Sequence, residues 1–148
     1  MEKTEDELLR IVTRVYAQAQ RLQARCCGIT TTQCQVLCAI GDEGTVPQAE
    51  LSARLGLEKS WVSRAIDSLE RDGLVERRKC CADARMYDVA FTEAGKARYE
   101  ALEEALNSQA ASVMASIPES ERAGVRKALE LLSVALSSMA ATCRCGNP

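Results

Sequence analysis

The feature that most constrains this chain's fold is the order of local patterns between residues 45 and 95. Two short helical patterns are separated by a tight turn at Gly56. The first is QAELSARL, and the second begins at Glu58, Lys59 or Ser60 and runs to about Arg71. After a turn at Asp72-Gly73, short strands are expected over residues 74–78 and 85–91, joined by a tip of sequence KCCADA. Two short helices followed by two short strands are typical of a winged helix-turn-helix, a module that binds DNA.

Two helices are predicted before this module. Apolar residues three or four positions apart form one stripe over about residues 4–27, as in a long amphipathic helix. Thr31 or Thr32 is expected to cap a second helix, because threonine at this position accepts hydrogen bonds from the first free backbone N–H groups. This helix is expected to extend to Ile40, with a turn over residues 41–44.

Two long helices are predicted after the module. Thr92 is expected to cap the first of them, and Pro118 is expected to end it because proline lacks the N–H that a helix interior needs. Ser116 or Ser120 is expected to cap the last helix, whose apolar stripe continues towards the C-terminus.

The predicted fold class is mainly α with a small β wing, a winged helix-turn-helix flanked by long dimerisation helices. The 148 residues suggest one domain, residues 1–148. Within it, residues 1–28 and 92–148 are expected to form the helical dimerisation region, and residues 29–91 the DNA-binding region. The long helices would leave apolar seams uncovered in a single copy, so a homodimer is expected, and two-fold symmetry suits paired DNA half-sites.

Composition and charge exclude several other classes. The chain is 47% hydrophobic and 27% charged, which favours a globular protein. The N-terminus is acidic, without the apolar core of a signal peptide, and no apolar run approaches the ~20 residues of a membrane span, so a cytoplasmic location is expected. The net charge of −2 weighs mildly against a DNA-binding protein, but phosphates are contacted locally. No catalytic constellation is recognisable, so an enzyme is not expected.

Several loosely spaced motifs in a fixed order resemble the MarR family, the multiple antibiotic resistance regulators. The motifs are Gln33-x-x-Val36-Leu37, Glu50-Leu51-Ser52-x-x-Leu55, Val62-Ser63-Arg64-x-Ile66-x-x-Leu69-Glu70-x-x-Gly73-Leu74-Val75-x-Arg77, Asp83-x-Arg85 and Phe91-Thr92-x-x-Gly95. The resemblance covers nearly the whole chain. It implies a dimeric bacterial repressor that binds a palindromic operator in double-stranded DNA and releases it when a signal arrives. The cysteine content is not a feature of the family, so the resemblance does not indicate the inducer.

The candidate DNA-binding residues lie at the start of the second short helix and in the wing. Arginine can bind guanine or a phosphate through two N–H groups, so Arg64 is the strongest candidate on the helix. Trp61 would either contact DNA or pack inward beside the apolar face. The family resemblance implies that Arg85 enters the minor groove, steadied by Asp83. The full candidate set is Lys59, Ser60, Trp61, Ser63, Arg64, Arg77, Arg78, Lys79, Asp83 and Arg85.

Eight cysteines and no histidine are the second unusual feature of the chain. In a reducing compartment, so many cysteines indicate metal or redox chemistry rather than a disulfide scaffold. A thiolate-rich site selects soft ions: Cu(I), Zn(II), Cd(II), Hg(II), As(III) or an iron–sulfur cluster. Packing is the alternative role, because a free cysteine is also a good small core residue. The candidate ligands, at expected helix ends or on the second helix, are Cys26, Cys27, Cys34, Cys38, Cys143 and Cys145. The wing pair Cys80-Cys81 is separate.

The sequence therefore predicts a dimeric repressor that releases its operator when a thiophilic metal or metalloid ion binds to cysteine thiolates. Thiol oxidation is one alternative signal, and a small aromatic ligand is another. A metal buffer that has lost DNA binding is a further alternative, against which the recognition-helix pattern and the Asp83-x-Arg85 wing argue.

Overall fold

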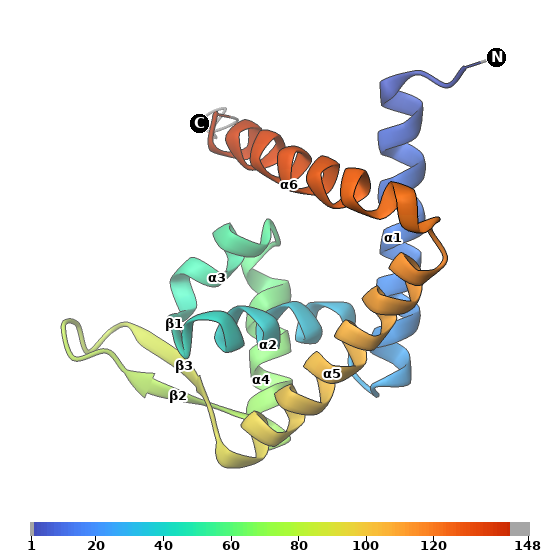
Figure 1. Ribbon diagram of the computed structural model, residues 1–148. Helices are drawn as coiled ribbons and strands as arrows, with labels where there is room; N and C mark the ends of the chain where they lie inside the picture. The colour runs from blue at the N-terminus through green and yellow to red at the C-terminus, as the bar shows by residue number, and fades with distance from the viewer. Residues whose placement is uncertain (1, 143–148) are drawn as a thin grey trace. The chain divides into compact units, whose positions relative to one another are not determined.

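A computed structural model describes residues 2–142, with side chains up to residue 139 (Figure 1). The chain forms two compact units, Met1–Leu106 and Asn107–Pro148. The described elements are α1 (Glu5–Cys26), α2 (Thr31–Glu43), β1 (Thr45–Pro47), α3 (Gln48–Leu55), α4 (Lys59–Arg71), β2 (Val75–Lys79), β3 (Tyr87–Phe91), α5 (Glu93–Ala115) and α6 (Glu119–Thr142). The predicted fold class, mainly α with a small β wing, is confirmed. None of the described helices is long and apolar enough to span a membrane.

Helix α2 starts and ends at different residues from those predicted. Its cap is Thr30, whose hydroxyl accepts a hydrogen bond from the Gln33 N–H (3.1 Å), while the Gln33 side chain accepts one from the Thr30 N–H (2.8 Å). Gly41 does not end the helix, which continues to Glu43. The ring of Tyr99 on α5 packs closely against this turn, and a Cβ atom at Gly41 would overlap it unless the ring shifted.

The helix-turn-helix is built as the sequence predicts. Gly56 ends α3 in the left-handed conformation (φ +63°), which glycine adopts without strain. Helix α4 then begins at Lys59 and buries one apolar face in the core of the first unit. That face consists of Val62, Ala65, Ile66 and Leu69.

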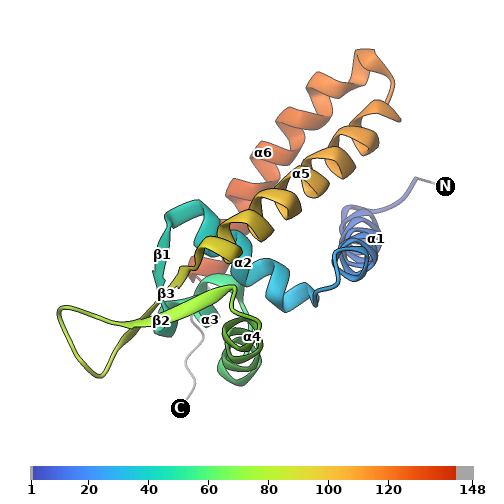
Figure 2. The same cartoon turned by 90° about the horizontal axis from the view of Figure 1, so that it is seen from below.

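A three-stranded antiparallel sheet, in the order β1-β3-β2, completes the first unit. Strand β1 was not predicted, because three residues ending in proline carry no alternating pattern; it pairs Val46 with Val89. The two wing strands are close to the predicted ones, and their outermost pair is Lys79 with Tyr87. Figure 2 shows the tip of this hairpin projecting away from the helices.

Helix α5 begins where the sequence predicts. The Thr92 hydroxyl accepts a hydrogen bond from the Gly95 N–H (3.0 Å) and donates one to the Gly73 carbonyl (2.6 Å), so the same side chain caps α5 and closes the turn after α4. The backbone of α5 lies so close to Leu74 that a Cβ atom at Gly95 would overlap the Leu74 carbonyl oxygen.

The second unit contains the end of α5 and α6. Neither predicted serine caps α6, which begins directly after Pro118; the Ser116 hydroxyl instead donates to the Val113 carbonyl (2.7 Å). The turn is held by Arg122, which donates to the carbonyls of Ile117 (3.0 Å) and Ala115 (3.1 Å). The free carbonyls at the end of a helix are thus satisfied by a cation, which also suits the helix dipole.

Candidate nucleic-acid interface and thiol pair

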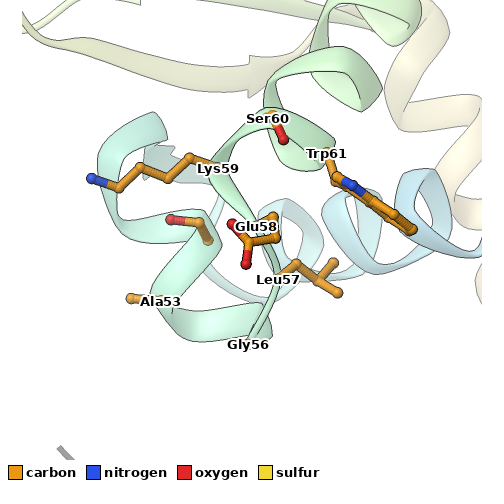
Figure 3. A pocket seen from close by; sticks show the side chains of 8 residues that line it. Ala53, Gly56, Leu57, Glu58, Lys59, Ser60 and Trp61 are labelled. Atoms are coloured by element: carbon orange, nitrogen blue, oxygen red, sulfur yellow. The ribbon is translucent and has the colours of Figure 1, made fainter. Parts of the chain in front are cut away.

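The first turns of α4 present polar and basic side chains to solvent. Lys59, Ser60 and Arg64 are exposed, and Ser63 is partly exposed. Trp61 is 59% exposed, so it does not pack inward beside the apolar face. Figure 3 shows Lys59 and Trp61 pointing to opposite sides of an open depression between α3 and α4. These side chains are all exposed to solvent, Ser63 in part.

The N-terminus of α4 has no side-chain cap. Glu58 occupies the cap position in an extended conformation, but its carboxylate accepts no capping hydrogen bond. The first free N–H groups of a helix and the positive end of its dipole favour an anion. Lys59 adds a positive charge that favours a phosphate at this end of α4, whereas the carboxylate of Glu58 opposes one.

The wing tip is shaped by Asp83. Its carboxylate accepts a hydrogen bond from the Arg85 N–H (3.0 Å), and its carbonyl accepts one from the Met86 N–H (3.0 Å). In the described chain no ion pair links the side chains of Asp83 and Arg85. Asp83 therefore fixes the turn through the backbone and leaves the Arg85 guanidinium exposed at the tip, with Lys79 exposed at the base of the tip.

Arg77 is held inside the first unit by three other residues. Its guanidinium donates to Asp67 (2.6 Å) and Glu70 (2.6 Å) on α4, and to the Gln48 side chain (2.8 Å) on α3. Its side chain is only 19% exposed. Burial alone would lower the pKa of Arg77, but the hydrogen bonds and charges of the two acids raise it. A phosphate contact, as the sequence predicts for Arg77, would require this side chain to leave those partners.

The Arg77 cluster, defined as Gln48, Asp67, Glu70 and Arg77, has two consequences for the surface. It joins β2 to α3 and α4, which fixes the wing against the helix-turn-helix. It also offsets part of the negative charge of two acids on α4, the helix that carries Lys59 and Arg64. Sequence spacing gave no signal for this cluster, because its members come from three elements. Arg78 is exposed and pairs with Glu76 two residues earlier.

The described cysteines lie at several separate positions in the fold. Cys26 is exposed at the end of α1, whereas Cys27 packs against the core of the first unit and accepts a hydrogen bond from Gln23 (3.7 Å). The predicted ligands Cys143 and Cys145 lie outside the described residues. Among residues that the structure describes, no three His, Cys, Asp or Glu side chains gather as a metal site. The described cysteines are all free thiols.

Cys34 and Cys38 form a pair one turn apart on α2, partly buried against the core. A hydrogen bond from Cys38 lowers the pKa of the Cys34 thiol to about 7, although burial would raise it. The pKa of Cys38 is raised because its thiol donates that bond, is partly buried, and lies near the charges of Cys34, Asp42 and Glu103. The hydrogen bond from Cys38 therefore favours the thiolate form of Cys34.

Replacing Cys38 with alanine should raise the pKa of Cys34 from about 7 towards the ordinary value of 9.0, because the hydrogen-bond donor is lost. The rate of Cys34 alkylation by iodoacetamide as a function of pH, followed by mass spectrometry, measures this pKa. Cys81→Ala, in the exposed wing tip, is the control and should leave the Cys34 profile unchanged. An unchanged profile in Cys38→Ala would show that the hydrogen bond does not set the Cys34 pKa.

Comparison with known proteins finds a family whose sequence model and solved structures resemble this chain. Residues 28–86, which span the helix-turn-helix and most of the wing, match the model of the MarR family. This part of the chain resembles the MarR family in sequence. Solved structures of regulators from this family share the fold over most of both chains. The resemblance to this family that the sequence motifs indicate is thus confirmed over residues 28–86.

Three solved structures illustrate the similarity. A mutant of MarR from E. coli is 22% identical and has a TM-score of 0.80, covering 89% of this chain and 98% of its own. A MarR transcriptional regulator from Methanosarcina mazei Go1 is also 22% identical, with a TM-score of 0.81 and coverage of 91% and 99%. NadR in complex with 4-hydroxyphenylacetate is 20% identical, with a TM-score of 0.74 and coverage of 95% of each chain.

Proposed function

We propose that this protein is a homodimeric transcriptional repressor of the MarR type that binds a palindromic operator through α4 and the wing. The observation that carries the proposal is the accessible N-terminal end of α4, with Lys59, Trp61 and Arg64 exposed beside a wing fixed by the Arg77 cluster. A recognition helix of this kind reads base edges in the major groove, and a wing arginine such as Arg85 suits the negative potential of a narrow minor groove.

Exposed apolar side chains support a dimer. On α1 they repeat along one stripe, and α6 presents a second set; all are more than two-fifths exposed in the single chain. Soluble proteins rarely leave contiguous apolar patches of this kind uncovered. A second copy with two-fold symmetry would cover such faces and present two recognition helices to two half-sites. The side chains are Leu8, Val12, Val15 and Leu22 on α1, and Leu129, Leu131, Val134 and Leu136 on α6.

Selection from a pool of random DNA duplexes tests this function directly. The expected result is enrichment of an inverted repeat whose half-sites lie about one helical turn apart. Light scattering of the complex should give two chains per duplex. Enrichment of a single unrepeated site, or binding without any enriched sequence, would contradict the dimeric operator-binding function.

Arg85→Ala should weaken operator binding about tenfold, or about 1.4 kcal/mol, because the exposed wing arginine is lost while the turn made by Asp83 remains. Fluorescence anisotropy with the selected duplex measures the change. Lys79→Ala is the comparison: we expect it to weaken all duplexes alike and to reduce the salt slope by about one, as the loss of a phosphate contact does. Unchanged affinity in Arg85→Ala would contradict a role for the wing in DNA binding.

The signal is proposed to be a thiophilic metal or metalloid ion bound by cysteine thiolates. The Cys34–Cys38 pair, with a Cys34 thiol whose pKa is lowered to about 7, supports thiol chemistry at the first unit. A small aromatic ligand remains the alternative, because the structurally similar NadR was solved with 4-hydroxyphenylacetate. Operator release is measured anaerobically with Hg(II), Cu(I), Cd(II), Zn(II), As(III), peroxide or the aromatic acid. Release by peroxide alone would favour oxidation as the signal.

A further inference from the structure

Cys34 and Cys38 offer two thiols on one face of α2. Residues four apart on a helix are neighbours on its surface, and both side chains are partly buried in the same packed region. Tyr99 on α5 packs across the following turn at Gly41. The negative charges of Asp42 and Glu103 act on Cys38, so the surroundings favour a cation over an anion.

The spacing of the pair decides which chemistry it can support. A disulfide needs Cβ atoms about 3.5–4.5 Å apart, whereas Cβ atoms four residues apart on a helix are about 5–6 Å apart. Two sulfurs bound in line to one metal ion, with metal–sulfur bonds of about 2.3 Å as in zinc thiolates, lie about 4.6 Å apart. An inserted ion therefore fits α2 as it stands, and a disulfide would require the helix to distort.

The number of available ligand side chains limits which metal ion the pair can bind. In the part of the chain that the structure describes, no third His, Cys, Asp or Glu joins this pair, and the sequence contains no histidine. Zn(II) in structural sites takes four ligands. A soft ion that is satisfied by two thiolates in line, such as Hg(II), needs no further donor.

We propose that Cys34 and Cys38 of one chain bind a single Hg(II) ion as a linear dithiolate. The ion forms two metal–sulfur bonds, two S–H bonds break, and two protons pass to solvent without any change of oxidation state. This inference specifies the ligand of the thiol-sensing part of the proposed function, and its test uses no DNA. Failure of the protein to bind an operator would therefore not bear on whether Cys34 and Cys38 bind the ion.

The position of the pair connects it with the recognition helix. On the same helix, the side chain of Gln33 donates a hydrogen bond to Ser68 on α4 (3.1 Å). Val36 and Leu37 of α2 and Ile66 of α4 lie in one hydrophobic core. An ion that fixes one turn of α2 thus acts on an element packed directly against the DNA-reading helix.

The test is titration of the full chain with Hg(II) under argon in the presence of excess glutathione, which removes the ion from single thiols. Gel filtration then separates the protein from glutathione, and the mercury content of the protein fraction reports binding. Cys34→Ser and Cys38→Ser should each lower the affinity roughly 100-fold or more, because chelation by two tethered groups is lost. The matched control is Cys80→Ser/Cys81→Ser in the wing, which should bind as the parent does. Equal affinity in Cys34→Ser and the parent would overturn the proposal.

The unaltered protein provides a second measurement that does not depend on the folding of a variant. After loading with one equivalent of Hg(II), alkylation and mass spectrometry show which cysteines the ion protects. Protection of Cys34 and Cys38, with Cys81 alkylated, is expected. Protection of the Cys80-Cys81 pair or of Cys143 and Cys145 instead would overturn the assignment. Zn(II) should give no protection at the pair, and equal protection by Zn(II) would contradict two-coordinate binding.

Discussion

Gly95→Ala is expected to lower the free energy of unfolding by about 3 kcal/mol, because the new methyl group would overlap the Leu74 carbonyl oxygen. That carbonyl cannot move freely, since it accepts a hydrogen bond from the Thr92 N–H (3.1 Å) beside the cap of α5. The higher helix propensity of alanine, worth about 1 kcal/mol, offsets only part of this cost. Urea unfolding followed by circular dichroism measures the change.

Gly124→Ala is the matched control. Gly124 also lies in a helix, α6, but a Cβ atom there would meet nothing within 4 Å. The same substitution should therefore leave stability unchanged or raise it by up to about 1 kcal/mol. If Gly95→Ala were as stable as Gly124→Ala, the close approach of α5 to Leu74 would not be a constraint on the fold.

The sequence predicts those parts of the fold that depend on local patterns. The helix-turn-helix follows from apolar periodicity and from Gly56, and the start of α5 follows from Thr92, whose side chain caps that helix in the structure. The sequence-based predictions are wrong where tertiary contacts determine the local structure. In the sequence, Gly41 indicates a helix end, but in the structure it lies inside α2, where the ring of Tyr99 packs against it. Strand β1 exists because β3 pairs with it.

In the candidate interface too, the positions set by local patterns could be predicted and those set by tertiary contacts could not. Exposed positions such as Lys59 and Arg64 follow from the amphipathic pattern of α4, because the apolar face fixes which side remains in solvent. The setting of Arg77 could not be predicted, since its partners on α3 and α4 are brought to it by the fold. The pairing of Cys34 with Cys38 was readable from their spacing, whereas the nearby charge of Glu103 on α5 was not.

Arg77→Ala is expected to weaken operator binding roughly 30-fold, or about 2 kcal/mol, even though Arg77 points into the protein. Two physical effects contribute to this loss of affinity. Asp67 and Glu70 lose their cation and repel DNA phosphates from the recognition helix, and the wing loses its link to Gln48 on α3. Anisotropy titrations at several salt concentrations measure the affinity and the salt slope. Urea unfolding determines how much of the variant is folded.

Removing the two acids in the same variant separates neutralisation from a direct phosphate contact. If Arg77 acts by neutralising α4, Asp67→Asn/Glu70→Gln in the Arg77→Ala background should restore most of the affinity, because the amides carry no charge to repel the duplex. If Arg77 instead leaves its partners and binds a phosphate, the affinity stays low and the salt slope stays reduced by about 0.9. The structure favours the first result, since three side chains hold the guanidinium at 2.6–2.8 Å.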